Sequence, residues 1–492
     1  MGGGKRMRMW TREELYRPLK EKAEIADLHD YVSKSAYRQA YHVQPVTGLL
    51  NDPNGFILHK GVWHLFYQWC PWGAVHGIKY WYHVVSKDLI QWKNAGICIR
   101  PDTDMDNYGA YSGSAISAKD AICLFYTGNH RDPDFVRKPK TCLVKLYDDG
   151  RTAKLPWPLF DENPAYTENQ RDPKIIYVEE KKSYYMLLGA QNAAMRGCVL
   201  VYESANLVDG WFFAGSLHVP GFEDFGDMWE CPSIERICGR DVLMFCPQHI
   251  YLPRRGKAVN HSGYILGEMD WDRLVFTPSG SFHVLDFGFD FYAAECAANF
   301  KSADHTYLTA WMGRPDGSYP TDEEGWQGCL TLPRELSVRD RRLIQKPLPG
   351  LADLRNKEVR PSEMILPESC EMMVMCSGGD LELRLFTRKD LSGGLVISYQ
   401  EEFHMITVDR SGMNLRINPE QGEIRQHLID NELTQLRVFI DRSSVEIFVN
   451  EGDAVFTARV FPTEEEGNFY LSPNANARIW TLKSAVVDDF CA

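Results

Sequence analysis

The sequence predicts an all-β protein in which a five-bladed β-propeller is followed by a C-terminal β-sandwich. Two observations predict this order. Similar apolar strands recur at nearly constant spacing through the first two thirds of the chain, and a second series of short alternating strands follows a break rich in Pro and Gly. The resulting boundaries are 1–36 for an N-terminal extension, 37–342 for the propeller, 343–361 for a linker and 362–492 for the sandwich.

The N-terminal extension is expected to hold a short helix. Thr11-Arg-Glu-Glu14 has the form of a capping box, and charged and apolar residues follow at helical spacing to about Ser33. Met1–Trp10 carries basic residues with no apolar core behind them, so no signal peptide is visible. No apolar run approaches the roughly 18 residues of a membrane helix. We therefore expect a cytoplasmic protein without a membrane partner, while the origin of the Gly-rich start stays open.

The propeller prediction depends on a repeat of about 60 residues. Five similar apolar strands are centred on Leu65, Leu124, Met186, Leu243 and Leu308, which lie 59, 62, 57 and 65 residues apart. A unit of this length with several short strands exceeds most solenoid repeats and suits a four-stranded propeller blade. Five such strands predict five blades.

The repeat ends near Arg341, where the pattern changes. Lys346-Pro-Leu-Pro-Gly350 is typical of a linker, with one helical turn after it. Apolar or alternating runs of strand length then follow at 381–386, 394–399, 436–441 and 445–449. Short strands separated by turns predict an antiparallel β-sandwich.

Charge and cysteine usage exclude several classes of protein. With 54 Lys and Arg against 67 Asp and Glu, the formal charge is −13, which argues against a nucleic-acid partner. The 13 cysteines include no C-x-x-C pair, and the histidines show no H-E-x-x-H spacing. We therefore expect reduced thiols, no metal site and no cofactor. These patterns do not define the oligomeric state, and a homo-oligomer stays open.

Three acidic residues occupy matching places in the repeat. Asp52, Asp172 and Glu230 lie 13, 14 and 13 residues before the strand centres of the first, third and fourth units. Because a propeller arranges equivalent positions around one axis, we expect the three carboxylates to meet at one end of its channel. Tyr111-Ser-Gly-Ser114 and Phe291-Tyr-Ala-Ala294 stand at the same offset in the other two units. Carboxylates, hydroxyls and aromatic rings together suit a sugar, and two carboxylates can cleave a glycosidic bond.

At these positions the sequence resembles glycoside hydrolase family thirty-two, the invertase, fructanase and sucrose-6-phosphate hydrolase group. The resemblance runs from about Tyr41 to near the C-terminus and includes 438–448 in the second region. The motifs that carry it in the first region are Leu49-Leu-Asn-Asp-Pro-Asn-Gly55, Tyr111-Ser-Gly-Ser114, Arg171-Asp-Pro-Lys174, Trp229-Glu-Cys-Pro232, Asp290-Phe-Tyr-Ala293 and Leu332-Pro-Arg-Glu-Leu336. Their order and spacing make the set specific.

The resemblance implies a retaining β-fructofuranosidase. Asp52 would be the nucleophile, Glu230 the general acid and base, and Asp172 the residue that binds fructosyl hydroxyls, with the first two carboxyls about 5 to 5.5 Å apart. Arg171 is expected to hold Asp172 ionised, while Glu230, between Trp and Cys, is expected to keep its proton longer. The expected substrate-binding residues are Leu49, Leu50, Asn51, Gln68, Lys79, Tyr111, Ser112, Arg171, Tyr292 and Trp311.

The resemblance favours sucrose 6-phosphate as the substrate, cleaved to glucose 6-phosphate and fructose. His76-Gly-Ile-Lys79 and the aromatic run after it are similar to the variant in some bacterial members, and Lys79 could meet the phosphate. Further candidate cations are Arg131, Arg137, Lys138 and Lys140. A sucrose or short-fructan hydrolase, a fructosyl transferase and a catalytically inactive sugar-binding propeller are the alternatives left open.

Overall fold

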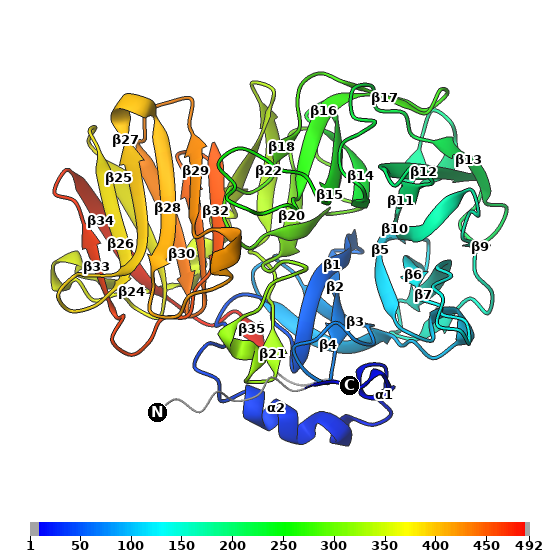
Figure 1. Cartoon of the computed structure of the whole chain (residues 1–492), viewed down its shortest axis with the longest axis horizontal. Coiled ribbons are helices and arrows are strands. Elements are labelled where there is room, and N and C mark those ends of the chain that lie inside the picture. Colours follow the sequence, from blue (N-terminus) through cyan, green and yellow to red (C-terminus); the bar gives the residue numbers. More distant parts are fainter. Residues whose placement is uncertain (1–8, 488–492) are drawn as a thin grey trace.

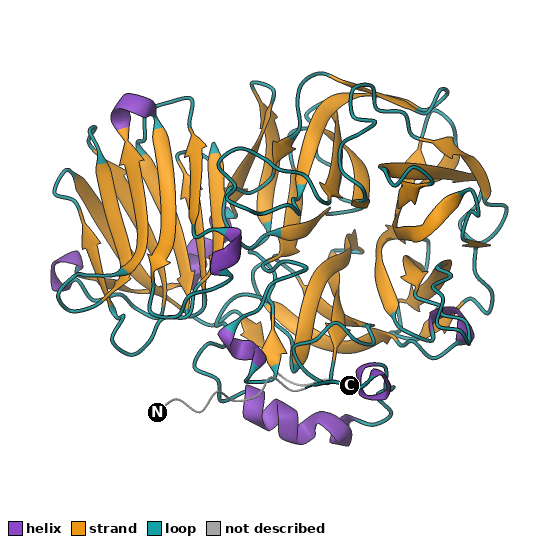
Figure 2. Ribbon diagram, viewed as in Figure 1, coloured by secondary structure: helices purple, strands orange, loops and turns teal. Residues whose placement is uncertain are grey.

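The computed structural model describes residues 9–487, which form two β domains side by side (Figure 1). The N-terminal domain runs from blue to green in Figure 1, and the C-terminal domain from yellow to red. Strands dominate both domains, and the helices are short (Figure 2). The Gly-rich start of the chain lies outside the described residues. No helix within residues 9–487 is both long and apolar enough to cross a bilayer.

The N-terminal extension contains two short helices where the sequence predicted one. Helix α1 (Arg12–Leu15) begins with the predicted capping box: the Thr11 side chain accepts from Glu14 N at 3.2 Å, and Glu14 accepts from Thr11 N at 2.9 Å. A 3₁₀ turn (Lys22–Ile25) then leads into α2 (Ala26–Val32). Pro18 lies between the helices, and proline is excluded from a helix interior because it lacks the N–H donor.

The N-terminal domain is a propeller domain, and its described residues form five sheets. The first sheet pairs β21 (Trp326–Gln327), β1 (Gly48–His59), β2 (Val62–Cys70), β3 (Tyr80–Ser86), β4 (Trp92–Ile99) and β35 (Val486–Val487), in that order. The second consists of β5 (Ala110–Ser117), β6 (Ala121–Gly128), β7 (Lys140–Tyr147) and β8 (Thr152–Lys154), with β9 (Phe160–Asp161) on β7.

The remaining three sheets of this domain repeat the same up-and-down order. The third contains β10 (Tyr166–Val178), β11 (Ser183–Asn192), β12 (Gly197–Ser204) and β13 (Phe212–Ser216). The fourth contains β14 (Trp229–Ile237), β15 (Arg240–Pro247), β16 (Gly263–Asp270) and β17 (Val275–Pro278), with β18 (His283–Val284) on β16. The fifth contains β19 (Tyr292–Cys296), β20 (Thr306–Trp311), β22 (Arg334–Arg339) and β23 (Arg342–Pro347).

The apolar strands that define the sequence repeat have equivalent places in these sheets. Their centres, Leu65, Leu124, Met186, Leu243 and Leu308, fall in β2, β6, β11, β15 and β20, each paired with the first strand of its sheet. Strand β6 is buried along its whole length. A strand covered on both faces can be apolar at every position, and for this reason these runs stand out in the sequence.

The C-terminal domain is a β-sandwich of two antiparallel sheets. One sheet has the order β24 (Arg355–Val359), β34 (Ala475–Leu482), β25 (Ser369–Cys376), β30 (Gln435–Asp441), β31 (Ser444–Val449) and β32 (Ala454–Arg459). The other has the order β29 (Ile424–Leu428), β28 (Met405–Gly412), β27 (Gly394–Gln400), β26 (Leu381–Thr387) and β33 (Asn468–Leu471). Buried side chains from both sheets, such as Leu383, Ile397 and Ile447, form one core between them.

The connection between the domains is shorter than the linker predicted at 343–361. Strand β23 continues the fifth sheet to Pro347, and β24 already pairs with β34 of the sandwich from Arg355. The segment between them is a 3₁₀ helix at Pro349–Leu354, with Leu351 and Leu354 buried. Proline and glycine suggested a longer linker, but strand pairing on both sides extends into it.

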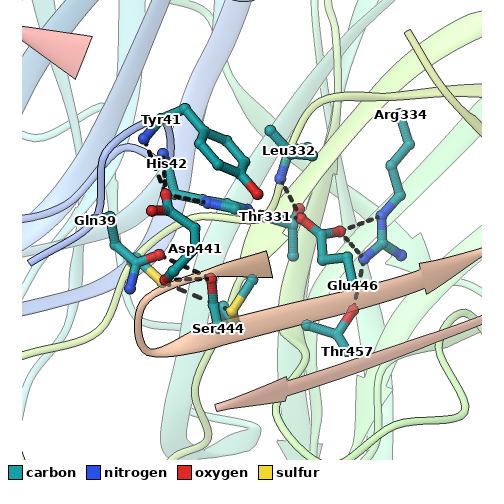
Figure 3. Close-up of polar contacts among 12 residues, drawn as sticks. Gln39, Tyr41, His42, Thr331, Leu332, Arg334, Asp441, Ser444, Glu446 and Thr457 are labelled. Atoms are coloured by element: carbon teal, nitrogen blue, oxygen red, sulfur yellow. Dashed lines mark hydrogen bonds and ion pairs between the residues drawn. The ribbon is translucent and has the colours of Figure 1, made fainter. Parts of the chain in front are cut away.

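A buried polar network joins the two domains (Figure 3). His42 Nδ1 lies 2.9 Å from Asp441 Oδ2, and His42 Nε2 lies 3.0 Å from Glu446 Oε1. Glu446 also accepts hydrogen bonds from Arg334 Nη2 at 2.6 Å and from Leu332 N at 2.8 Å. Burial alone would lower the pKa of His42, but the hydrogen bonds and charges of the two carboxylates raise it to about 9. A protonated imidazole therefore connects the sandwich to the segment that enters β1.

Candidate active site

In each sheet of the propeller domain, the strand that is first in sequence is irregular where the sequence placed a candidate residue. These strands are β1, β5, β10, β14 and β19. The register against the neighbouring strand slips at 51/53, 111/113, 171/174, 230/233 and 292/295. Asp172, Cys231 and Ala293 at these slips have positive φ, at 65°, 48° and 50°. β-Bulges redirect the side chains beside them, and strained backbone of this kind concentrates at functional sites. The recurring bulge explains why matching sequence positions reach the same place.

The bulges border one cavity of about 240 Å³. Asp52, Asp172 and Glu230 all line it, so the structure brings the three predicted acids together. Its other lining residues are Asn51, Gln68, His76, Lys79, Tyr111, Arg137, Arg171, Tyr292, Trp311 and Pro315. A smaller space of about 30 Å³, lined by the next residues of the same five strands, adjoins it at Asp172. The cavity therefore lies where the sheets converge.

Asp52 is held by two neighbours through one of its oxygens. Ser112 Oγ donates to Asp52 Oδ2 at 2.6 Å, and Gln68 Nε2 donates to the same oxygen at 3.1 Å. Burial raises the pKa of Asp52, the hydrogen bond from Ser112 opposes the rise, and the charge of Glu230 adds to it. A carboxylate oriented from one side is suited to attack as a nucleophile.

Asp172 is buried against backbone and hydroxyl groups. Its backbone N–H donates to Thr127 Oγ1 at 2.9 Å, and its Oδ2 accepts from Cys231 N at 3.1 Å. Burial raises the pKa of Asp172 to about 7, Arg171 opposes the rise, and the charges of the other two acids add to it. The expectation that Arg171 holds Asp172 ionised is therefore corrected: burial outweighs the adjacent cation.

Glu230 accepts hydrogen bonds from two of the predicted sugar contacts, Arg171 and Tyr292, and from Gln248. Arg171 Nε and Nη2 donate to Glu230 Oε1 at 3.0 and 2.8 Å. Gln248 Nε2 and Tyr292 OH donate to Oε2 at 2.8 and 2.6 Å. The expectation of an apolar environment from the flanking Trp229 and Cys231 is thus also corrected. Neighbours along a strand point to opposite faces, so they do not define the surroundings of the residue between them.

The expected sugar contacts divide into two groups. All but three of them line the cavity, and Ser112 lies just behind it, bonded to Asp52. Leu49 and Leu50 do not reach it, because both side chains are fully buried in the core of the domain. Lys79 is buried as well and donates from Nζ to Asn51 Oδ1 at 2.6 Å. Burial lowers the pKa of Lys79 to about 8.

Of the candidate cations in the loop after β6, Arg137 lines the cavity. Arg131 donates to a backbone carbonyl at 2.8 Å, and Lys138 and Lys140 pair with nearby aspartates at 3.4 and 2.6 Å. The loop therefore offers one cation to the cavity at Arg137, beside Lys79 and His76.

Two cavity residues, His76 and Pro315, were not among the predicted contacts, and neither was Gln248, which donates to Glu230. Gln248 follows β15, whose Cys246 pairs with Glu230 across the sheet. The contact depends on the register between β14 and β15, and no pattern in the sequence predicts that register. No group of three or more His, Cys, Asp or Glu side chains in residues 9–487 is arranged to hold a metal ion.

Comparison with known proteins identifies the family. The description "Glycosyl hydrolases family 32 N-terminal domain" matches residues 42–347, and "Glycosyl hydrolases family 32 C terminal" matches residues 368–488. The chain belongs to glycosyl hydrolase family 32. The family's two parts thus coincide with the propeller domain and the sandwich, and the resemblance drawn from the motifs is confirmed.

Relatives in family 32 cover nearly the whole chain. A sucrose-6-phosphate hydrolase of Staphylococcus xylosus is 38% identical, covering 94% of this chain and 98% of the relative. The structure of a sucrose-6-phosphate hydrolase from Lactobacillus gasseri superimposes with a TM-score of 0.90 at 34% identity, covering 97% of this chain and 100% of the other. A Bombyx mori family 32 β-fructofuranosidase in complex with sucrose gives a TM-score of 0.81 at 29% identity, covering 95% and 100%.

Proposed function

We propose that this chain is a retaining β-fructofuranosidase that hydrolyses sucrose 6-phosphate to glucose 6-phosphate and fructose. The observation that carries the proposal is that Asp52, Asp172 and Glu230 border one cavity, each with different partners. The relatives named sucrose-6-phosphate hydrolase, similar over almost the full length, support the choice of substrate.

The reaction follows from the partners of each acid. Asp52 attacks C2 of the fructosyl unit, and Glu230 gives its proton to the glycosidic oxygen as that bond breaks and glucose 6-phosphate leaves. Glu230 then takes a proton from the water that attacks C2, which releases fructose and regenerates Asp52. Two displacements at C2 retain its configuration.

The third acid, Asp172, is assigned to binding of the fructosyl unit. Burial and the charges of the other two carboxylates raise the pKa of Asp172 to about 7. Hydroxyl groups of the fructosyl unit can donate to Asp172 when it is ionised. Arg171, Gln248 and Tyr292 orient the carboxyl of Glu230 toward the leaving oxygen.

Recognition of the phosphate is assigned to the cations of the same cavity. Lys79 and Arg137 line it together with the catalytic acids, whereas burial lowers the pKa of the neighbouring His76 to about 3 and leaves it neutral. Arg137 supplies a planar donor group that suits a phosphate oxygen pair, and Lys79 supplies a point charge. The net charge of −13 repels an anionic substrate, so a local cluster of cations is needed.

A substrate panel with product analysis tests the proposal. The purified chain is given sucrose 6-phosphate, sucrose and a short fructan, and NMR follows the anomer of fructose that forms first. A higher kcat/KM for sucrose 6-phosphate and initial release of the β-anomer are expected. Arg137→Ala and Lys79→Ala should reduce kcat/KM for sucrose 6-phosphate more than for sucrose, whereas Lys138→Ala, a loop cation paired with Asp132, should change neither.

The other outcomes separate the alternatives. Equal kcat/KM for sucrose 6-phosphate and sucrose, unchanged by Lys79→Ala, would indicate an invertase. A higher kcat/KM for the short fructan would indicate a fructan hydrolase. Oligosaccharide products at high sucrose would indicate fructosyl transfer. Sugar binding without turnover would indicate an inactive sugar-binding propeller.

We also infer that the five sheets of the N-terminal domain are the blades of a five-bladed propeller. The repeated bulge at the first strand of each sheet supports it.

A phosphorylated sugar as substrate favours a cytoplasmic location, which fractionation of the source cells tests.

A further inference from the structure

Three loops meet where the propeller domain contacts the sandwich. They are 254–261 of the fourth sheet, 312–318 of the fifth and 417–425 of the sandwich. Lys257 N donates to Gln421 O at 3.1 Å, Ser318 N donates to Asn418 Oδ1 at 3.0 Å, and Gln421 Nε2 donates to Asp316 Oδ2 at 2.8 Å. Each loop thus touches the sandwich loop or is touched by it.

These loops enclose a group of basic side chains, which we name the junction cluster: Arg255, Arg314, Arg410, Arg425 and His261. Arg425 is 1% exposed, and Arg410 and His261 are 2% exposed. The charges of Arg255, Arg314 and Arg410 all act on Arg425, and Arg255 and Arg425 act on His261, so the group is compact. Backbone also lies close to it, since a Cβ on Gly256 would stand 2.9 Å from Arg425 Nη1.

The carboxylates around the junction cluster pair with Arg410 and Arg314 or with residues outside the cluster. Asp290 accepts from Arg410 Nη1 at 2.9 Å, and Asp316 accepts from Arg314 Nε at 3.0 Å. Asp286 pairs with Arg334, outside the cluster, at 3.0 Å. Within residues 9–487, neither Arg255 nor Arg425 has a carboxylate partner within salt-bridge distance.

Several donors of the junction cluster are buried without an acceptor in the described chain. They are Nε and Nη1 of Arg255, Nε of Arg410 and Nε of Arg425. Arg425 Nη1 donates to two backbone carbonyls, Gly422 O at 3.2 Å and Ile424 O at 3.0 Å, and its guanidinium lies 4.6 Å from the centroid of the Phe289 ring. These contacts leave its charge without a counter-ion.

Unpaired buried donors are rare in folded proteins, and so many in one place require an acceptor. We propose that the junction cluster binds a small inorganic oxyanion of the phosphate class between the two domains. Guanidinium groups from two sides match a tetrahedral oxyanion, whose several oxygens can accept from both. The anion would supply the missing counter-charge. Consistent with that need, burial and the neighbouring arginines lower the pKa of Arg425 to about 8.

The junction cluster is connected to the active site through two of its loops. The connection from β15 to β16 begins at Gln248, the partner of Glu230, and contains Arg255 and His261. Arg314 immediately precedes Pro315, which lines the cavity. An anion that ties these loops to the sandwich would therefore stabilise both the domain interface and the wall of the active site.

Phosphate titration of the whole chain tests the proposal. The melting temperature is followed against inorganic phosphate in the low millimolar range, with chloride at matched ionic strength as reference. We expect a saturable rise with phosphate in the wild type and in Arg137→Gln, which alters the active-site cavity alone. We expect no such rise in Arg255→Met, and Arg425→Gln serves the same purpose if Arg255→Met does not fold.

The matched variants separate the outcomes. An equal rise in Arg255→Met and the wild type would overturn the proposal, as would absence of any saturable rise. A rise lost in Arg137→Gln and kept in Arg255→Met would place phosphate in the active site and would also overturn it. The proposed function is tested separately by hydrolysis of the substrate panel, so failure here leaves it standing.

Discussion

Gln248 Nε2 donates a hydrogen bond of 2.8 Å to Glu230 Oε2, although the two residues are brought together only by the pairing of β14 with β15. Tyr292 donates to the same oxygen at 2.6 Å, while Arg171 occupies the other. The proposed acid and base of the reaction is thus oriented by residues from three sheets of the propeller domain. The predictions below concern this carboxyl, the other two acids and the domain interface.

Gln248→Ala should lower kcat/KM by about tenfold, the cost of one hydrogen bond to a charged group. Initial rates over a range of substrate concentrations measure this effect. Gln44→Ala removes a buried amide that bonds to Gln39 O at 2.9 Å, away from the cavity, and should leave kcat/KM unchanged. Equal kcat/KM for the two variants would contradict the role of Gln248.

Asp52→Asn should abolish turnover, by at least roughly 1,000-fold, because an amide cannot form the covalent intermediate. Ser112→Ala removes the hydrogen bond to Asp52 Oδ2 and the one that Ser112 Oγ accepts from Gln68 Nε2, and should cost about tenfold. Single-turnover assays distinguish the two variants, and circular dichroism checks that both are folded. Substantial turnover by Asp52→Asn would rule out a covalent role for this residue.

Asp172→Asn should raise stability while it lowers activity. The pKa of Asp172 is about 7 in the folded protein, above its unfolded value of about 4, so its contribution to stability is fully present below pH 4 and is lost as the pH rises through 7. Asparagine does not ionise, so the variant does not lose stability in this way. Its gain in melting temperature over the wild type should therefore grow from pH 4 to pH 8. Asp132→Asn, in an exposed loop with the same Arg-Asp-Pro tripeptide, should show no such gain. A pH-independent difference between wild type and Asp172→Asn would refute the assignment.

The domain interface should weaken as the pH rises from 6.5 to 9. The pKa of His42 is raised to about 9, so its contribution is fully present below the unfolded value of about 6.5 and is lost as the pH passes 9. Asp441, Glu446 and Arg334 are the charged groups around it, and the shift corresponds to roughly 3 kcal/mol. His42→Asn should destabilise the protein at pH 6 and flatten the dependence.

Melting temperatures at pH 6 and pH 9 test this prediction for His42. The control is His218→Asn, whose side chain is exposed at the surface. The two substitutions remove the same chemical group, and the buried one alone should change the pH dependence. Parallel curves for all three proteins would show that His42 does not hold the interface in its charged form.

Much of the fold could be read from the order of residues. The spacing of Leu65, Leu124, Met186, Leu243 and Leu308 is a one-dimensional property, and strands buried on both faces keep it visible as apolar runs. The offset of Asp52, Asp172 and Glu230 from those runs is equally local, so their meeting in one cavity followed from the repeat. The capping box at Thr11 was a local signal of the same kind.

The partners of these acids depended on contacts that no local pattern encodes. Bulges at the first strand of each sheet turn Arg171 toward Glu230, and burial rather than the adjacent cation controls Asp172. Leu49 and Leu50 belong to a motif shared with sugar contacts, yet their side chains pack in the core. Sequence spacing places a residue along a strand, whereas hydrogen-bond partners and burial depend on how strands from distant segments pack around it, and only the assembled domains define that.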